Sequence, residues 1–282
     1  MSAWTDEINP EIHFIWHGDS PAGWVEPARR LFDNELMMVT RGTCVITICN
    51  QPFRCGPGDY VIVPPDTLHA THADSRQGVY RYCIHFNWNY TGKPRPATHC
   101  VIHPALIPVH LVHRSPAFVP RDILHGKAPL APSLDLLGQL AIVPTSTNSM
   151  RRVTGRALFL QLLLLILALP SARKPDREQR SVTLALQVRE LLSQPVNAQQ
   201  SVRELLETLG HSYGHLCRLF RQYHGVTPVA YLNAMRVERA KILLRNSQYS
   251  ARDIATMAGF SSPQYFSRVF RRLTGMTPGN FA

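Results

Sequence analysis

Apolar side chains recur with helical spacing in two segments near the end of the chain. Each segment places four apolar residues at positions i, i+3, i+4 and i+7, the periodicity of a helix that buries one stripe. They are Leu216, Leu219, Phe220 and Tyr223 in the earlier segment, and Phe266, Val269, Phe270 and Leu273 in the later one. The two stripes are the same four positions displaced by fifty residues. We therefore predict two similar amphipathic helices.

The similarity extends beyond the apolar stripes, because whole segments repeat. The stretch "SYGHLCRLFRQYHGVTP" (212–228) returns as "SPQYFSRVFRRLTGMTP" (262–278), and a turn glycine precedes each copy, Gly210 and Gly259. Glycine reaches the left-handed conformations that tight turns require. Each copy is therefore predicted to be a helix, a glycine turn and a second helix. The identical pairs are Ser212/Ser262, Arg218/Arg268, Phe220/Phe270, Arg221/Arg271, Gly225/Gly275, Thr227/Thr277 and Pro228/Pro278.

The face opposite each apolar stripe is short, polar and cationic. An α-helix fits the major groove of B-DNA, where Arg pairs bidentately with guanine and Gln with adenine. Ser212 and Ser262 suit helix N-caps, and Arg221 and Arg271 suit backbone phosphates. The alternative is a small helical bundle whose arginines are only solvated, but the repeat and the sorted faces favour DNA binding. These faces carry Gly214, Cys217, Arg218 and Arg221 in the first copy, and Gln264, Ser267, Arg268 and Arg271 in the second.

A long helix is expected between the two copies. Thr227-Pro228 supplies an N-cap and a proline at the first helical position, and helix-forming residues continue to about Asn246. About 17 residues at 1.5 Å each span roughly 26 Å. This is of the same order as the ~34 Å helical turn that separates successive major-groove segments. The repeat would thus let one polypeptide read two adjacent groove segments.

The positive charge is concentrated at the same end of the chain. The net charge is +11, and residues 181–282 hold 12 Lys and Arg against 5 Asp and Glu. A basic domain favours nucleic acid or an anionic membrane surface, and charge alone does not choose between them. The strongest apolar run (157–170) ends at Pro170, short of the roughly 20 residues that span a bilayer. We therefore expect no membrane partner.

The cysteines point to a reducing compartment. The chain has 6 cysteines, at positions 44, 49, 55, 83, 100 and 217, with no CxxC spacing and no disulfide-rich density. No charged, then apolar, then small-residue leader opens the sequence. We expect a cytoplasmic protein.

At these residues the C-terminal segment resembles the DNA-binding domain of the AraC/XylS family of bacterial transcription regulators. The resemblance rests on "LCRLFRQYHGVTPVAYLNAMRVERAKILL" and "DIATMAGFSSPQYFSRVFRRLTGMTP", and it covers about residues 181–281. It implies double-stranded DNA and RNA polymerase as partners, and activation by family habit. Gly214 and Cys217 depart from the larger side chains common in the family, so base reading by the first helix would depend mainly on Arg218. The residues implied to face DNA are Tyr213, Gly214, Cys217 and Arg218 in the first copy, and Pro263, Gln264, Tyr265, Ser267 and Arg268 in the second.

Between Glu35 and Trp88 the pattern changes to short β runs separated by turn signals, which predicts a small barrel or sandwich. The order "RG…CGPGDYVIVPPDTLH", within residues 30–90, resembles the cupin-like sensor domain of many AraC-type proteins. His69 is the only match to a cupin metal ligand, because the first cupin motif has no histidine near "GTCVITI". A metal needs several converging ligands. We therefore expect no metal, no cofactor and no enzyme activity.

The strand "VYRYCIHFNW" (79–88) has two dissimilar faces. Alternation places Arg81, Cys83, His85 and Asn87 on one face and aromatic or apolar residues on the other. By composition the aromatic face would enter the core and the polar face would meet water. By resemblance to family sensors the polar face would line a pocket for a small polar effector such as a sugar. The candidate effector-binding residues are His69, Thr71, Arg81, Cys83 and His85.

The segment after the strands contains prolines, one short helix and then a helix from Met150 to Leu169 that is almost entirely leucine in its second half. A helix so apolar on every side must be buried, against a second copy of itself, against the barrel or only within its own chain. By resemblance this region forms a homodimer contact. We therefore expect an effector-binding domain at 1–128, a linker with the dimerisation helix (about 150–169) at 129–180, and a DNA-binding domain at 181–282.

The sequence thus predicts an α+β protein, with an N-terminal cupin-like β-barrel sensor and a C-terminal all-α domain in which a long helix joins two helix-turn-helix units. The expected function is a DNA-binding transcription regulator controlled by a small polar effector. Two alternatives stay open. One is a cupin-type metal enzyme fused to a DNA-binding domain, and the other is a constitutive regulator whose barrel only dimerises.

Overall fold

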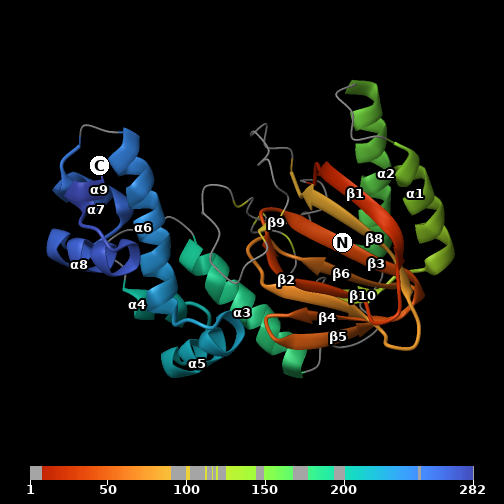
Figure 1. Ribbon diagram of the computed structural model, residues 1–282, viewed down its shortest axis with the longest axis horizontal. Coiled ribbons are helices and arrows are strands. Elements are labelled where there is room, and N and C mark those ends of the chain that lie inside the picture. Colours follow the sequence, from red (N-terminus) through yellow and green to blue (C-terminus); the bar gives the residue numbers. More distant parts are fainter. Residues whose placement is uncertain are drawn as a thin grey trace. The chain divides into compact units, whose positions relative to one another are not determined.

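The computed structural model describes residues 8–89, 100–101, 112, 116, 119, 125–143, 149–167, 177–193, 201–246 and 249–281. Contacts within the chain define two compact units, which divide between Asp176 and Arg177 (Figure 1). The first unit holds all the described strands and two helices, and the second is helical. This is the predicted α+β fold, with a sheet-rich N-terminal domain and a helical C-terminal domain.

Two five-stranded sheets, in which all the paired strands are antiparallel, form the first unit. One sheet has the order β1 (Glu11–Ser20), β8 (Val79–Asn87), β3 (Asn34–Gly42), β6 (Asp59–Val63) and β10 (His125–Lys127). The other has the order β5 (Gln51–Cys55), β4 (Cys44–Ile48), β7 (His69–Ala73), β2 (Val25–Leu31) and β9 (Cys100–Val101).

Strand β8 is buried on both of its faces, the polar one and the aromatic one. Residues 81–87 are all buried, although every second side chain is polar or a thiol. The polar face lies inside the barrel, where Arg81 reaches Glu26 of β2 in the other sheet. The aromatic face packs on helices outside the sheet, with the rings of Phe86 and Phe159 4.9 Å apart. The composition-based expectation that the polar face meets water is therefore wrong.

Helices α1 (Leu130–Ile142) and α2 (Ser149–Leu167) cover this outer face of the sheet (Figure 1). On α2 a single stripe is buried in that core, formed by Phe159, Leu162, Leu163 and Ile166. Met150, Val153 and Leu164 on the same helix are exposed, at 72%, 56% and 37%. Within this chain the barrel buries only one face of the helix, so burial of the other face against a second copy stays a prediction.

The second unit contains seven helices among its described residues. They are α3 (Arg177–Ser193), α4 (Val202–Glu207), α5 (Tyr213–His224), α6 (Pro228–Asn246), α7 (Ala251–Ala258), α8 (Pro263–Thr274) and α9 (Pro278–Phe281). The long helix α6 joins α4–α5 to α7–α8, and α5, α7 and α8 all pack against it. The two helix-turn-helix units and their connection are as the repeat predicted. No helix among the described residues is long and apolar enough to cross a membrane.

Local sequence signals explain where these helices begin and end. Ser201 and Glu204 form a capping box at α4, which satisfies two backbone N–H groups at the helix start. Gly225 and Gly275 end α5 and α8 in the left-handed conformation, with φ of 76° and 79°. These glycines occupy equivalent positions in the two copies. The repeat therefore includes the residue that ends each helix as well as the apolar residues along it.

Candidate functional site

The second helix of each unit is fixed by its apolar stripe. Seven of the eight predicted stripe residues are buried beneath α5 and α8, and only Leu273 departs, with 47% of its surface exposed. Leu273 lies in the last turn of α8, beyond the core formed by Phe266, Val269 and Phe270. The turns before the two helices use Gly210 and Gly259, with φ of 71° and 93°.

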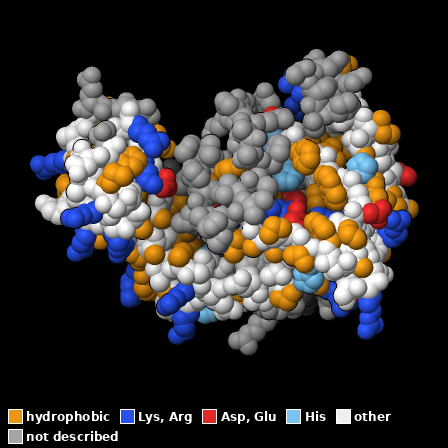
Figure 2. All heavy atoms as spheres, in the orientation of Figure 1, with side chains coloured by type: hydrophobic (Ala, Val, Ile, Leu, Met, Phe, Trp, Pro, Cys, Tyr) orange, Lys and Arg blue, Asp and Glu red, His pale blue; other side chains and the backbone are white. Residues whose placement is uncertain are grey.

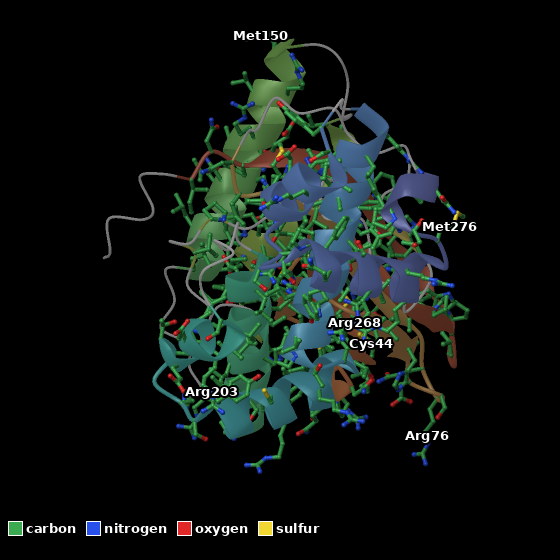
Figure 3. All side chains as sticks on the ribbon, turned by 90° about the vertical axis from the view of Figure 1, so that its left-hand side faces the viewer. Cys44, Arg76, Met150, Arg203, Arg268 and Met276 are labelled. Atoms are coloured by element: carbon green, nitrogen blue, oxygen red, sulfur yellow. The ribbon has the colours of Figure 1, made fainter. Side chains whose placement is uncertain are left out.

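The opposite faces of α5 and α8 carry the residues predicted to meet DNA. Arg218 and Arg268 occupy equivalent places, and both are exposed. In Figure 2 Lys and Arg side chains project from the surface of this unit at several points, and Arg268 is labelled in Figure 3. The exposed members of the set are Ser212, Gly214, Arg218, Arg221, Gln264, Ser267, Arg268 and Arg271, and the half-buried ones are Tyr213, Cys217, Ser262, Pro263 and Tyr265.

Both tyrosines in this set are held by neighbouring side chains. The Tyr265 hydroxyl accepts a hydrogen bond from Asn233 Nδ2 of α6 at 2.7 Å, and the Arg268 guanidinium lies 5.4 Å from the centre of its ring. In the first copy Arg203 of α4 lies over the Tyr213 ring at 4.7 Å. Burial, followed by a hydrogen bond with Cys217, raises the pKa of Tyr213. Tyr213 and Tyr265 therefore lie at the start of each helix, each against a neighbouring arginine. One of these arginines, Arg203, lies outside the repeated segments of the sequence.

The two N-cap serines differ. Ser262 Oγ accepts a hydrogen bond from the backbone N–H of Tyr265 at 3.2 Å, as an N-cap should. Ser212 occupies the cap position of α5 but makes no side-chain cap hydrogen bond. Ser212 is exposed at the start of the helix.

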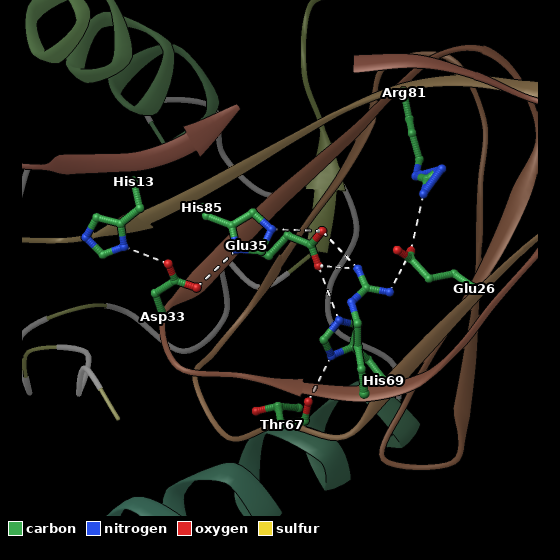
Figure 4. Close-up of polar contacts among 9 residues, drawn as sticks. His13, Glu26, Asp33, Glu35, Thr67, His69, Arg81 and His85 are labelled. Atoms are coloured by element: carbon green, nitrogen blue, oxygen red, sulfur yellow. Dashed lines mark hydrogen bonds and ion pairs between the residues drawn. The ribbon is translucent and has the colours of Figure 1, made fainter. Parts of the chain in front are cut away.

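The second candidate site is the interior of the barrel, which holds a network of buried charges centred on Glu35 (Figure 4). Arg29 NH2 donates to both carboxylate oxygens of Glu35, at 3.2 and 3.3 Å. His69 Nε2 lies 3.2 Å from Oε2, and His85 Nε2 lies 3.9 Å from Oε1. Burial alone would raise the pKa of Glu35, but Arg29 and the two histidines hold that pKa well below its usual range. Glu35 is therefore a carboxylate inside the barrel.

Asp33 extends this network toward β1. His13 Nδ1 lies 2.6 Å from one carboxylate oxygen of Asp33, and His85 Nδ1 lies 3.1 Å from the other. Burial opposes ionisation of Asp33, but these two hydrogen bonds lower its pKa. The pKa of His85 is raised against its own burial by the hydrogen bond with Asp33 and the charge of Glu35.

Arg81 is held between aromatic rings. Its guanidinium lies 4.3 Å from the ring centre of Trp24 and 4.8 Å from that of Trp16. It also donates to Ser20 Oγ at 2.8 Å and pairs with Glu26 at 3.2 Å, and Glu26 in turn pairs with Arg29 at 2.6 Å. The interior thus combines aromatic surfaces with groups that donate and accept hydrogen bonds, which is the chemistry that a small polar ligand requires.

The five predicted effector-binding residues are all buried inside the barrel. Glu35 brings His69 and His85 together, and Arg81 is connected to them through Glu26 and Arg29. Burial raises the pKa of Cys83 well above its usual value, so this residue is a neutral thiol, and Thr71 lies buried on β7. The network also contains residues that sequence reasoning missed, namely His13, Glu26, Arg29, Asp33 and Glu35. The density of charge in "EPARRLFDNE" (26–35), between apolar strands, was the available signal.

The histidines and acidic residues of the barrel are also of the types that bind metal ions, which require several converging ligands. Across the described residues, no group of three or more His, Cys, Asp or Glu side chains is arranged to hold a metal ion. Ring nitrogens of His13, His69 and His85 lie 2.6–3.2 Å from carboxylate oxygens of Asp33 and Glu35.

Comparison with known proteins matches both units. The family model of the AraC-like ligand-binding domain matches residues 28–90. The model of a helix-turn-helix domain matches residues 205–282. The arabinose operon regulatory protein of Escherichia coli K12 is 24% identical over 250 residues, which cover 87% of this chain and 79% of that protein. With both domain types in one chain and in this order, the chain belongs to the AraC/XylS family of transcription regulators.

Other relatives are also described as regulators. YisR of Bacillus subtilis, an uncharacterized HTH-type transcriptional regulator, is 24% identical over 247 residues (86% of this chain, 83% of that protein). SACOL0084 of Staphylococcus aureus, described in the same words, is 26% identical over 251 residues, 88% of this chain. The chain spans only 31% of that relative's length. A solved structure of ToxT from Vibrio cholerae with bound unsaturated fatty acid is 12% identical, with a TM-score of 0.33, covering 96% of this chain and 94% of ToxT.

The buried contacts of Glu35 predict that replacing its carboxylate by an amide strongly lowers the free energy of unfolding. Glu35→Gln keeps the shape of the side chain but leaves the Arg29 charge partly uncompensated, so it should lower the free energy of unfolding by about 3–5 kcal/mol. Asp19→Asn is the matched control, because Asp19 and Arg41 form an exposed pair, and it should cost less than about 1 kcal/mol. Urea unfolding followed by tryptophan fluorescence reports on this unit, since all 4 tryptophans lie within residues 1–88. Equal losses in the two variants would contradict the role of Glu35.

Proposed function

We propose that the chain is a transcription regulator that reads two adjacent major-groove segments of DNA with α5 and α8, under the control of a small polar effector bound in the barrel. The observation that carries the proposal is the repeat. Two helices fifty residues apart bury three equivalent apolar residues and expose the same arginine, and one connecting helix joins them. A helical bundle with a purely structural role needs neither the repetition nor the exposed cations.

The dimensions of the second unit fit this proposal. Helix α6 has 19 residues, which at 1.5 Å each give a length of about 28 Å. This is close to the ~34 Å repeat of the major groove along one face of DNA. We propose that Arg218 and Arg268 contact base edges, and that Arg221 and Arg271, one turn further along each helix, contact phosphates. The half-buried Tyr213 and Tyr265 border these positions.

An effector in the barrel is supported by the chemistry of its interior. Carboxylates, imidazoles and the Arg81 guanidinium offer hydrogen bonds, and Trp16 and Trp24 offer flat apolar surfaces. A sugar presents hydroxyl groups around an apolar ring face, so it suits this combination. Binding would shift the population between two arrangements of the DNA-binding units, provided that the effector has different affinities for them.

The remaining partners follow from the family and from the surface of α2. We propose a homodimer, because the exposed side of α2 carries Met150, Val153 and Leu164, and sedimentation equilibrium of the full chain tests it. Activation through contact with RNA polymerase, a cytoplasmic location and the lack of enzyme activity are proposed on family grounds. The relatives matched here are described as regulators.

One observation favours a second candidate, a regulator that binds DNA constitutively and uses its barrel only to dimerise. Glu35, Asp33, Glu26 and Arg29 already pair with one another or with histidines inside the barrel. An effector would therefore have to exchange some of these contacts for its own. The effector titration described below separates the two candidates.

Arg268 is predicted to read a base. On a duplex selected from random DNA by the full chain, Arg268→Ala should weaken binding by about 1–3 kcal/mol and relax specificity at one base pair. Arg239→Ala is the control, because Arg239 is exposed on α6 rather than on α8, and it should leave both properties unchanged. Fluorescence anisotropy with the parent duplex and its single-base variants gives both quantities. Equal weakening on all duplexes would restrict Arg268 to phosphate contact.

Effector binding should be visible in tryptophan emission, because Trp16 and Trp24 flank Arg81. Titration of the full chain with a panel of sugars should give a saturable change for one compound, and that compound should also change the affinity for the selected duplex. Arg81→Ala should abolish the response. Arg54→Ala should retain it, since Arg54 is paired with Asp74 at the surface. Sequence-specific DNA binding with no response to any compound would favour the constitutive regulator.

A further inference from the structure

Two buried cysteines lie directly opposite each other in the β4–β5 hairpin. The register of the two strands pairs Cys44 with Cys55, and 1% and 0% of their surfaces are exposed. Both are present as thiols. The third buried cysteine on a strand of the barrel, Cys83, is opposite Met37 and Trp16 instead. In the register of the described strands, Cys44 and Cys55 are the only cysteines that lie opposite each other.

The geometry of the hairpin sets the distance between the two backbones. Cys49 and Asn50 form a two-residue turn with φ of 49° and 69°, the conformation in which the flanking pair Ile48 and Gln51 exchanges both hydrogen bonds. Hydrogen-bonded and non-hydrogen-bonded pairs alternate from there, and Pro52, which has no N–H, falls at a non-hydrogen-bonded position. Cys44 and Cys55 form a hydrogen-bonded pair, whose Cα atoms lie about 5.5 Å apart. Disulfides span about 4.4–6.8 Å between Cα atoms.

The two sulfurs are not chemically equivalent. A hydrogen bond from the Cys55 thiol lowers the pKa of Cys44 against its burial, and the charge of Arg81 acts in the same direction. The same hydrogen bond raises the pKa of Cys55. Of the two sulfurs, Cys44 therefore loses its proton more readily, and the thiolate is the nucleophilic form of cysteine. Cys44 is labelled in Figure 3.

We propose that Cys44 and Cys55 are a redox site, which hydrogen peroxide converts into a reversible disulfide. The Cys44 thiolate attacks one peroxide oxygen, and the O–O bond breaks to give a sulfenic acid and, after protonation, one water. The Cys55 sulfur then attacks the Cys44 sulfur, and the sulfenic hydroxyl leaves as a second water. Two thiols and one peroxide thus give one disulfide and two waters. Disulfides that form in a reducing compartment are characteristically transient or redox-sensing.

The hairpin lies at the edge of its sheet, where a small oxidant can reach its buried sulfurs through local opening. Strand β5 is at the end of its sheet and pairs only with β4 among the described strands. An edge hairpin opens locally at lower cost than a central strand, which admits peroxide to buried sulfurs. Oxidation would lock β4 to β5 and remove the ionisable Cys44 thiol, whose charged form Arg81 favours. The redox site therefore reaches the same barrel interior as the proposed effector, but it does not depend on one.

The test uses the full chain and mass spectrometry. Trypsin cleaves after Arg41, Arg54 and Arg76, so Cys44 and Cys55 fall in different peptides, residues 42–54 and 55–76. After brief exposure to peroxide, denaturation with an alkylating reagent and digestion, these peptides should be joined by a bond that dithiothreitol cleaves. Cys49→Ser is the matched control, because Cys49 lies in the same hairpin and in the same peptide as Cys44. That variant should still give the joined peptides.

The joined pair should be lost in Cys44→Ser and Cys55→Ser. If these variants fail to fold, the parent chain and Cys49→Ser still decide the matter, since in the latter Cys44 is the only cysteine of its peptide. Three results would overturn the proposal. They are complete alkylation of both cysteines after peroxide treatment, a cross-link that involves Cys49 or Cys83 instead, and oxidation of Cys44 to sulfinic or sulfonic acid without any joined peptide.

Discussion

The burial of the Glu35 charge is the constraint on which the first unit depends. An isolated carboxylate inside a protein is costly, and it is tolerated only where partners compensate the lost hydration. Glu35 comes from β3 of one sheet, whereas Arg29 and His69 come from β2 and β7 of the other. The ion pairs therefore fix how the two sheets face each other. A slip of one residue in β3 would turn Glu35 away from both partners.

The polar interior has a consequence for where the apolar core lies. Because one face of β8 is committed to charged partners, its aromatic face must be covered on the outside, and α1 and α2 supply the cover. The second unit differs, because its interior is mainly apolar. The predicted DNA-facing arginines are at its surface, and a repeated apolar stripe beneath α5 and α8 holds these helices while leaving Arg218 and Arg268 exposed. One unit is thus suited to contain a polar ligand, and the other is suited to present cations to DNA.

The parts of this fold that local signals determine could be predicted from the sequence. Helical periodicity, glycine stops and the repeated residues identified α5, α6 and α8 and their exposed faces. Alternation identified the two faces of β8 but could not choose the buried one, because both faces are buried against different partners. Glu35, Asp33 and Arg29 were missed because most of their partners lie on other strands and come close only when the two sheets assemble. Leu273 and the outer side of α2 show the same limit, since an apolar residue is buried only where another element covers it.

A hydroxyl-radical footprint of the full chain, on a DNA duplex that it selects, shows directly whether both repeated helices contact DNA. With α5 and α8 in successive major-groove segments, two protected patches should lie on one face of the duplex, about 10 bp apart from centre to centre. A single patch, or protection that does not depend on the DNA sequence, would contradict the claim that the repeated helices read adjacent segments of DNA.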